Sequence, residues 1–207
     1  RVIKQAEFPS LWYNEFADEN FINIFLQLCE NSQMVIDLFA EDKILRESFL
    51  SRDFLSEYEQ GGIKKIRLKN ILFKLAVQLT IKLTEPKTAS KVLSNAVREK
   101  IKSLTDEFSK KKKWKNDYLV IVLGSTGTST MTFASDVDLI FAVKNSGKYQ
   151  NIQKDFQELL GILKKELSPF SVDCRLRPEG ASSQLVWDFE KYVEYLNTRA
   201  RIWELQA

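Results

Sequence analysis

The residues best suited to chemistry begin with a pair of acidic side chains. Asp136 and Asp138 stand two positions apart at the start of an apolar run, Leu139 to Val143. Successive side chains of a strand point to opposite faces, so both carboxylates are predicted to share one face. Neighbouring carboxylates repel each other unless a positive charge lies between them. A divalent metal ion is the usual solution, and Mg²⁺ bound together with substrate phosphates is its usual form.

A phosphate-binding turn is predicted before this pair. The apolar run Tyr118 to Leu123 has strand character and breaks at Gly124 and Ser125. Gly124 allows close approach of the backbone, and the amides and hydroxyl group around Ser125 can bind nucleotide phosphates. The pattern is not a P-loop, because no Gly-Lys-Ser/Thr sequence closes it. A plain turn is the alternative role for Ser125.

A third carboxylate and two arginines follow later in the chain. The segment Phe170 to Leu176 is predicted to be a strand, and Asp173, Arg175 and Arg177 alternate along it and just after it. All three side chains are therefore expected on one side. Asp173 would complete a two-metal site and help to deprotonate an acceptor hydroxyl. The arginines suit triphosphate oxygens, which they bind bidentately.

Together these residues favour Mg²⁺-dependent nucleotidyl transfer, in which metal ions neutralise the attacking and leaving oxygens of an in-line displacement. Alternatives remain for each group. Asp136 and Asp138 are also suited to capping backbone amides at the start of a strand. Asp173 is suited to an ion pair with either arginine, and both arginines to structural pairing with the acidic cluster.

The elements that position these residues are predicted to form an α/β arrangement from residue 116 to residue 207. A helix of one or two turns fits between Gly124 and Asp136, and an amphipathic helix follows Gly147. A strand, a helix of this length and another strand usually form a parallel crossover. Asp188 is predicted to cap a last helix. Its expected buried face comprises Phe189, Tyr192, Val193, Leu196, Ala200 and Trp203.

Residues 1–115 are predicted to be all helical, because apolar residues recur there at helical spacing. A packed bundle is the plain interpretation, and a surface that recognises a protein partner is the alternative. The basic run Lys110 to Lys115 ends this region. It suits a solvated helix end, where lysines favour the negative end of the dipole. The alternative is a nucleic-acid contact with Trp114 stacked on a base.

Composition narrows the functional classes. The 207 residues contain no histidine, which excludes a histidine nucleophile, general base or zinc ligand. No apolar run approaches the roughly 20 residues of a membrane helix, and no signal peptide is apparent. Cys29 and Cys174 lack metal-ligand spacing, so a cytoplasmic setting is expected. The net charge of +3 is too small to indicate a nucleic-acid partner. The start at Arg1 and the end inside a predicted helix at Ala207 suggest a fragment.

These motifs resemble those of a known family. The Gly-Ser…Asp-x-Asp pattern is that of the nucleotidyltransferase superfamily. A more detailed resemblance is to the glutamine synthetase adenylyltransferase / adenylyl-removing enzymes, which read G-K-L-G-G-x-E-L-x-x-x-S-D-x-D-L-I-F. Residues 124–141 read GSTGTSTMTFASDVDLIF. The family's V-D-x-R-L-R-P-E-G is matched by residues 172–180, and its L-V, Tyr-rich helix and W-E-R-Q-A by residues 185–207.

The resemblance implies an α+β or α/β nucleotidyltransferase domain, with a mixed sheet and flanking helices, preceded by a helical region. It implies that Asp136, Asp138 and Asp173 hold Mg²⁺ and that ATP or ADP is the nucleotide. A tyrosine of glutamine synthetase would gain AMP from ATP, or lose it to phosphate with release of ADP. A PII signal protein is implied as a further partner; membrane and nucleic acid are not.

The chain departs from the family pattern at three positions. Ser125, Thr130 and Leu205 stand where the family has Lys, Glu and Arg. Serine is the commoner residue of the superfamily at the first position, so phosphate binding is still expected. The other two departures leave open a different acceptor, such as RNA or a small molecule. They also leave open a regulatory module that binds nucleotide with little or no turnover.

Overall fold

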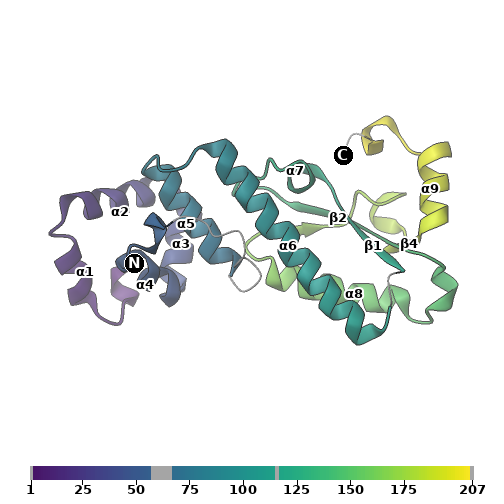
Figure 1. The fold of residues 1–207 in the computed structure, drawn as a ribbon, viewed down its shortest axis with the longest axis horizontal. Helices are drawn as coiled ribbons and strands as arrows, with labels where there is room; N and C mark the ends of the chain where they lie inside the picture. The colour runs from purple at the N-terminus through teal and green to yellow at the C-terminus, as the bar shows by residue number, and fades with distance from the viewer. Residues whose placement is uncertain (1, 57–66, 115–116, 206–207) are drawn as a thin grey trace. The chain divides into compact units, whose positions relative to one another are not determined.

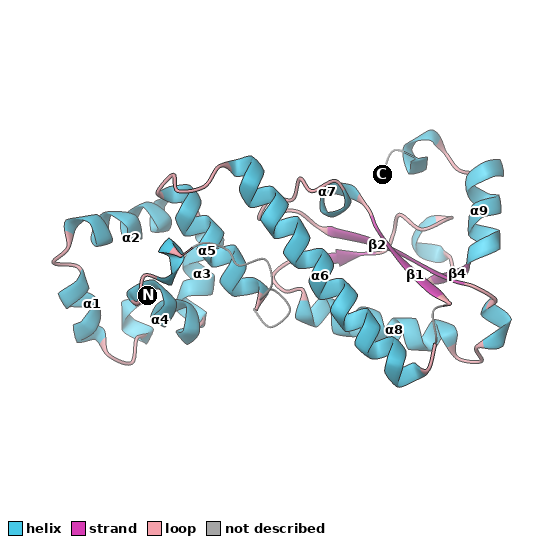
Figure 2. Cartoon of the chain, viewed as in Figure 1, coloured by secondary structure: helices cyan, strands magenta, loops and turns pink. Residues whose placement is uncertain are grey.

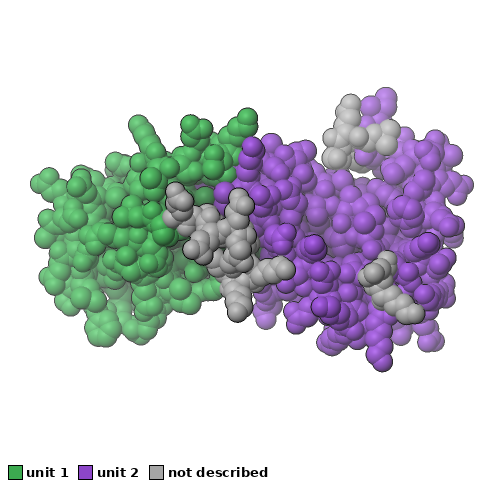
Figure 3. Space-filling view, viewed as in Figure 1, with its two compact units in different colours: residues 1–89 green, residues 90–207 purple. Residues whose placement is uncertain are grey.

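The computed structural model describes residues 2–56, 67–114 and 117–205 of the chain (Figure 1). The chain divides into two compact units, residues 1–89 and residues 90–207 (Figure 3). Helix α6, Pro86–Lys112, begins before this division and lies mostly in unit 2. The sequence prediction instead assigned residues up to 115 to the helical region. Gln206 and Ala207, the last residues of the family motif, lie outside the described residues.

The described residues of unit 1 form helices joined by turns and loops, with no strand among them (Figure 2). Asp18, Ser32 and Asp42 accept hydrogen bonds from backbone amides at the starts of successive helices, as side chains of these types do at N-caps. Trp12 and Phe49 are buried in an aromatic core, with ring centroids 6.1 Å apart. The predicted helical N-terminal region is confirmed. Its helices are α1 (Pro9–Glu15), α2 (Glu19–Asn31), α3 (Gln33–Glu41), α4 (Lys43–Leu50) and α5 (Leu68–Thr80).

Unit 2 contains a small mixed sheet in which strand β2 pairs with each of the strands β1, β3 and β4 (Figure 2). Strand β1 is antiparallel to β2, whereas β3 and β4 are parallel to it. The predicted parallel crossover through helix α8 is therefore confirmed. The elements are β1 (Tyr118–Val122), α7 (Gly124–Gly127), β2 (Val137–Val143), α8 (Ile152–Glu166), β3 (Val172–Asp173), β4 (Val186–Asp188) and α9 (Phe189–Thr198).

The two faces of this sheet have different neighbours. Phe156 of α8 lies 5.1 Å from Phe141 of β2, measured between ring centroids, so α8 packs on the face of Phe141. Ile140 points to the opposite face and packs with Trp187 and Tyr192. Asp138 shares the face of Ile140, because the two residues are two positions apart on β2. One face of the sheet is therefore covered by α8. The other face carries the Asp138 carboxylate, next to the cluster of Ile140, Trp187 and Tyr192.

The predicted alternative for Trp114 is wrong. Its side chain is only 1% exposed and stacks on Phe156 at 4.3 Å between centroids, so it is not available to stack on a base. Lys112 of the same basic run lies 2.8 Å from carboxylate oxygens of both Asp155 and Glu158. This part of the run ties α6 to α8. Lys115 lies outside the described residues.

Two sequence predictions need correction. Strand β3 stops at Asp173 instead of Leu176, because the Asp173 carboxylate accepts a hydrogen bond from the Arg175 amide at 2.7 Å and turns the chain. The face expected for the last helix is confirmed at Tyr192, which is buried, and at Leu196, which packs against the same cluster, but it is wrong at Phe189 and Val193. Phe189 and Val193 are 41% and 39% exposed, whereas Tyr192 and Tyr195 are buried. Helix α9 ends at Thr198, and the Trp203 side chain lies outside what the structure describes.

Across the described ranges, no helix of the structure combines the length and apolar character needed to cross a membrane.

The predicted cap at Asp188 is confirmed and gives a test of the fold. Its carboxylate accepts hydrogen bonds from the amides of Glu190 at 3.2 Å and Ser146 at 3.0 Å. The hydrogen bond from the Ser146 amide is the main cause that lowers the pKa of Asp188 below its ordinary value of 3.8. Because the folded-state pKa is depressed, this stabilisation is present above pH 3.8 and is lost as pH falls through the folded value.

We expect Asp188→Ala to lower the free energy of unfolding at neutral pH by about 1 kcal/mol, measured by urea denaturation. Asp188→Asn is expected to retain most of the stability, because asparagine also caps helices. Glu190→Ala, on the exposed start of the same helix, is the matched control. Equal stability of Asp188→Ala and the native chain would contradict the role of this cap.

Candidate active site

The turn after β1 brings the backbone against a carboxylate. Gly124 has a φ of +58°, and a Cβ atom added there would lie 2.8 Å from Oδ2 of Asp138. The Leu123 amide donates to the Asp138 carbonyl oxygen at 2.9 Å, which fixes the end of β1 beside the carboxylate. A positive φ strains any residue with a side chain. Glycine is therefore required here for two reasons, conformation and space.

A second glycine shapes the same turn, and sequence reasoning missed it. A Cβ atom at Gly127 would lie 2.6 Å from the carbonyl oxygen of Val122. The Thr128 amide donates to the Gly124 carbonyl at 3.0 Å, and the Thr130 amide to the Ser125 carbonyl at 2.9 Å. The spacing of Gly124 and Gly127 was the sequence signal for a tight turn. The predicted helix of one or two turns in this gap is confirmed as α7, which has 4 residues.

An arginine of helix α6 holds this turn from the other side. The Arg98 guanidinium donates to the carbonyl oxygens of Thr126 at 2.9 Å and Gly127 at 3.0 Å. It also donates to the Ser129 hydroxyl at 3.0 Å. The last carbonyls of a short helix have no partner within the helix. Arg98 supplies these partners, and no local sequence motif marks it.

The carboxylates gather where β2 pairs with β3. Asp138 and Asp173 are direct partners in the strand register. Burial raises the pKa of Asp138, and the negative charges of Asp173 and Asp136 raise it further, while Arg175 lowers it. Asp136 precedes β2 and accepts a hydrogen bond from the Ser171 hydroxyl. All three predicted carboxylates are thus electrostatic neighbours at one end of the sheet.

Arg175 neutralises one of these carboxylates. Its Nε donates to Oδ2 of Asp173 at 2.6 Å, and a second guanidinium nitrogen lies 2.5 Å from the same oxygen. The pKa of Asp173 is lowered, mainly by this hydrogen bond from Arg175. The Arg175 side chain is otherwise 75% exposed. The structure thus contains the ion pair that was one alternative for Asp173.

Arg177 lines the same cavity as Asp173, but its guanidinium bonds to backbone carbonyl groups and not to a carboxylate. Its guanidinium donates to the carbonyl oxygens of Cys174 at 2.6 Å, Ala181 at 2.7 Å and Ser183 at 3.1 Å. In this structure it closes the loop that follows β3. Phosphate binding by Arg177 remains a prediction, and it would require these contacts to be shared or broken.

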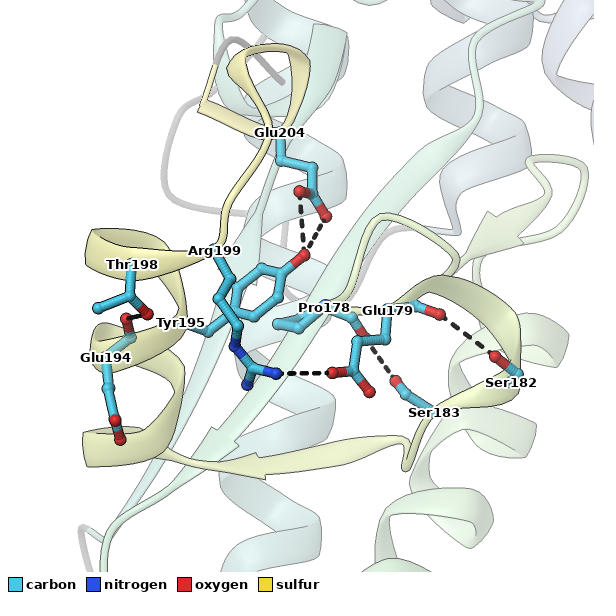
Figure 4. Close-up of polar contacts among 9 residues, drawn as sticks. All are labelled: Pro178, Glu179, Ser182, Ser183, Glu194, Tyr195, Thr198, Arg199 and Glu204. Carbon is cyan, nitrogen blue, oxygen red and sulfur yellow. Dashed lines mark hydrogen bonds and ion pairs between the residues drawn. The ribbon is translucent and has the colours of Figure 1, made fainter.

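The same loop is held to the C-terminal helix (Figure 4). Arg199 lies 3.2 Å from the Glu179 carboxylate, and the Ser183 hydroxyl donates to the Pro178 carbonyl at 2.6 Å. The Tyr195 hydroxyl donates to the Glu204 carboxylate at 2.9 Å. The residues that match the family's P-E-G and W-E motifs therefore support the loop that carries the arginines.

The donor set at the site fits Mg²⁺. Within the described part of the chain, no three acidic, cysteine or histidine side chains converge closely enough to hold an ion by themselves. Mg²⁺ usually needs only one or two carboxylates, together with substrate phosphates and waters. Asp136 and Asp138 supply such carboxylates, and their mutual repulsion favours a cation between them.

A helical region followed by a small mixed sheet, with the glycine turn facing Asp138, defines a nucleotidyltransferase-like α+β fold. A family model described as glutamate-ammonia ligase adenylyltransferase matches residues 78–207, more than half of the chain. The chain belongs to this family.

Individual relatives agree with the family model. The bifunctional glutamine synthetase adenylyltransferase/adenylyl-removing enzyme of Haemophilus ducreyi is 28% identical over 174 residues, 75% of this chain and 18% of the relative. The enzymes of the same name from Aromatoleum aromaticum and Idiomarina loihiensis are 31% and 34% identical, over 45% and 43% of this chain and 11% of each relative. The chain thus spans less than a fifth of the length of these relatives.

We expect Gly124→Ala to displace the Asp138 carboxylate, because the new methyl group would overlap Oδ2, and to strain the backbone by about 1 kcal/mol. The result should be a lower melting temperature and loss of nucleotide binding, measured by calorimetry. Gly161→Ala is the matched control. It lies in helix α8 with open space around its Cβ position, so it should stabilise the chain by about 1 kcal/mol. Unchanged nucleotide binding in Gly124→Ala would contradict the close approach.

We expect Arg98→Ala to loosen the turn, because three acceptors lose their donor. Hydrogen exchange of the amides of Thr128 and Thr130 should become faster, while exchange in β1 stays unchanged. Lys102→Ala, one helical turn further along α6 and exposed, is the control. Equal exchange in both variants would show that Arg98 does not hold the turn.

Proposed function

We propose that this chain is a Mg²⁺-dependent nucleotidyltransferase domain that transfers AMP from ATP to a tyrosine of glutamine synthetase, or removes it from that tyrosine by phosphorolysis. The observation that carries the proposal is the contact of the Gly124 turn with Asp138, whose register partner is Asp173. The printed names of the relatives supply the substrate. A PII signal protein as regulatory partner stays a prediction of the family resemblance.

The proposed reaction is an in-line displacement at the α-phosphorus of ATP. The phenolic oxygen of the tyrosine forms the new bond to phosphorus, and the bond to the oxygen that bridges to the β-phosphate breaks. The phenolic proton passes to a carboxylate of this face. Asp173 is the candidate acceptor, because it lies beside Asp138 in the strand register. Its pairing with Arg175 lowers its pKa, so it becomes a stronger base when Arg175 moves to the nucleotide phosphates. In the reverse direction, phosphate replaces the tyrosine oxygen and ADP is released.

Each part of the site has a proposed task. The amides and hydroxyl group around Gly124 and Ser125 bind the β- and γ-phosphates, since a tight glycine turn exposes its N–H groups. Asp136 and Asp138 would hold Mg²⁺, which neutralises negative charge on the phosphate oxygens. Arg175 is exposed on one side and can contact the nucleotide phosphates if it leaves Asp173.

A nucleotide-binding regulatory module is the second candidate, and two observations favour it. Asp173 is already neutralised by Arg175 at 2.6 Å, which weakens it both as a base and as a metal ligand. Thr130, where the family has Glu, bonds to the Thr128 hydroxyl at 2.9 Å and brings no charge to the site. Such a module would bind ATP but transfer no AMP.

Incubation of the chain with ATP labelled at the α-phosphate, Mg²⁺ and glutamine synthetase separates the two candidates. The transferase reading predicts labelled glutamine synthetase, or loss of label from adenylylated enzyme when phosphate is added. Asp138→Asn should reduce transfer by about a hundredfold. ATP binding without any transfer in either direction would support the regulatory module and overturn the transferase.

The fold of Asp138→Asn can be checked in the same experiment. Without metal, this variant should melt at a higher temperature than the native chain, because it removes a half-buried charge that two other carboxylates repel. Mg²⁺ should raise the melting temperature of the native chain more than that of the variant.

A further inference from the structure

A large open cavity lies beside strand β3, away from the Gly124 turn. Its volume is about 750 Å³, and its walls come from helix α8, strand β3 and the loop 174–185. Asp136 and Asp173 line one part of it, but the turn 124–127 does not. A volume in the range of about 300–1,000 Å³ suits a ligand of many atoms. The cavity is therefore large enough for a tyrosine side chain with flanking backbone.

The order of the strands gives this cavity its place in the reaction. The sheet runs β1-β2-β3, so the turn that follows β1 and the cavity beside β3 flank Asp138 of β2 from opposite sides. In-line displacement requires the attacking and leaving oxygens on opposite sides of the phosphorus atom. If the triphosphate lies on the turn, the attacking group approaches from the side of the cavity.

Helix α8 presents a separate face to the cavity. Gln153, Gln157, Leu160 and Lys164 recur at spacings of 4, 3 and 4, so they form one stripe beside the buried stripe of this helix. Gln153 is occupied, because its amide group bonds to both backbone groups of Val186, at 2.7 and 3.1 Å. Gln157 and Lys164 are exposed.

Lys164 is the cation of this cavity that is left for a ligand. Arg177 is used by loop carbonyls and Arg175 by Asp173. Among the residues that the structure describes, no ion pair or hydrogen bond joins Lys164 to another side chain, while the nearby Glu166 pairs with Lys100 at 3.1 Å. An ammonium group in a cavity attracts an anionic group such as a carboxylate.

We propose that this cavity binds the acceptor segment of the protein substrate, and that Lys164 recognises an acidic residue close to the acceptor tyrosine. The inference rests on the proposed function. Leu160 and Leu185 give apolar contact to the tyrosine ring, and the phenolic oxygen points to Asp173. The amide of Gln157 binds the backbone of the segment.

Lys164→Glu tests this inference. The variant should raise the KM for glutamine synthetase about tenfold, because an attraction becomes a repulsion, and leave the KM for ATP unchanged. Lys165→Glu is the matched control, since it makes the same charge change at the next, exposed position outside the cavity.

Several outcomes would overturn the inference. Equal effects of Lys164→Glu and Lys165→Glu would indicate general charge attraction, and a raised KM for ATP would make the cavity a nucleotide site. A raised KM for inorganic phosphate alone, in the removal direction, would make it a phosphate site. Direct binding of glutamine synthetase without nucleotide, measured by calorimetry, separates this inference from the proposed function. If glutamine synthetase binds more weakly to Lys164→Glu than to the native chain, the cavity is supported as the site of the acceptor segment, even if no AMP is transferred.

Discussion

The approach of the Gly124 backbone to the Asp138 carboxylate is the contact on which the rest of the site depends. The antiparallel pairing of β1 with β2 brings the two residues together, through the hydrogen bond from the Leu123 amide to the Asp138 carbonyl. A Cβ atom on Gly124 would lie 2.8 Å from Oδ2 of Asp138, so any side chain there would displace this carboxylate. A negative charge therefore lies directly beside a turn that is suited to phosphate, and the two become compatible when a cation joins them.

Arginine side chains stabilise the surroundings of this contact. Arg98 completes the hydrogen bonds of the turn, Arg177 those of the loop after β3, and Arg175 balances the charge of Asp173. The planar guanidinium suits all three tasks, since it offers several donors in fixed directions. An arginine next to a phosphate site is thus not by itself evidence for phosphate binding. Arg175 pairs with the Asp173 carboxylate and is otherwise exposed, whereas Arg177 bonds to carbonyl groups of its own loop.

The arrangement separates two approaches to the carboxylates. The turn follows β1, the cavity lies beside β3, and Asp138 stands on the strand between them. Helix α8 contributes to both the core and the cavity, because its apolar stripe covers one sheet face and the neighbouring stripe faces the open space. A site with two sides suits a reaction with two large substrates, and the family to which the chain belongs is described by such a transfer.

The sequence by itself determined the elements whose signals are local. The glycine turn, the Asp-x-Asp pair, the parallel crossover and the cap at Asp188 depend on residues close in the chain, and the structure contains them. Only the tertiary structure decided which contacts Arg177 makes, that Trp114 is buried, and that Lys164 faces a cavity. These outcomes depend on segments distant in sequence. Competition for hydrogen bonds matters as well. The Asp173 side chain ends β3 because it accepts a hydrogen bond from the Arg175 amide, and the alternation of residue types along the chain does not predict this contact.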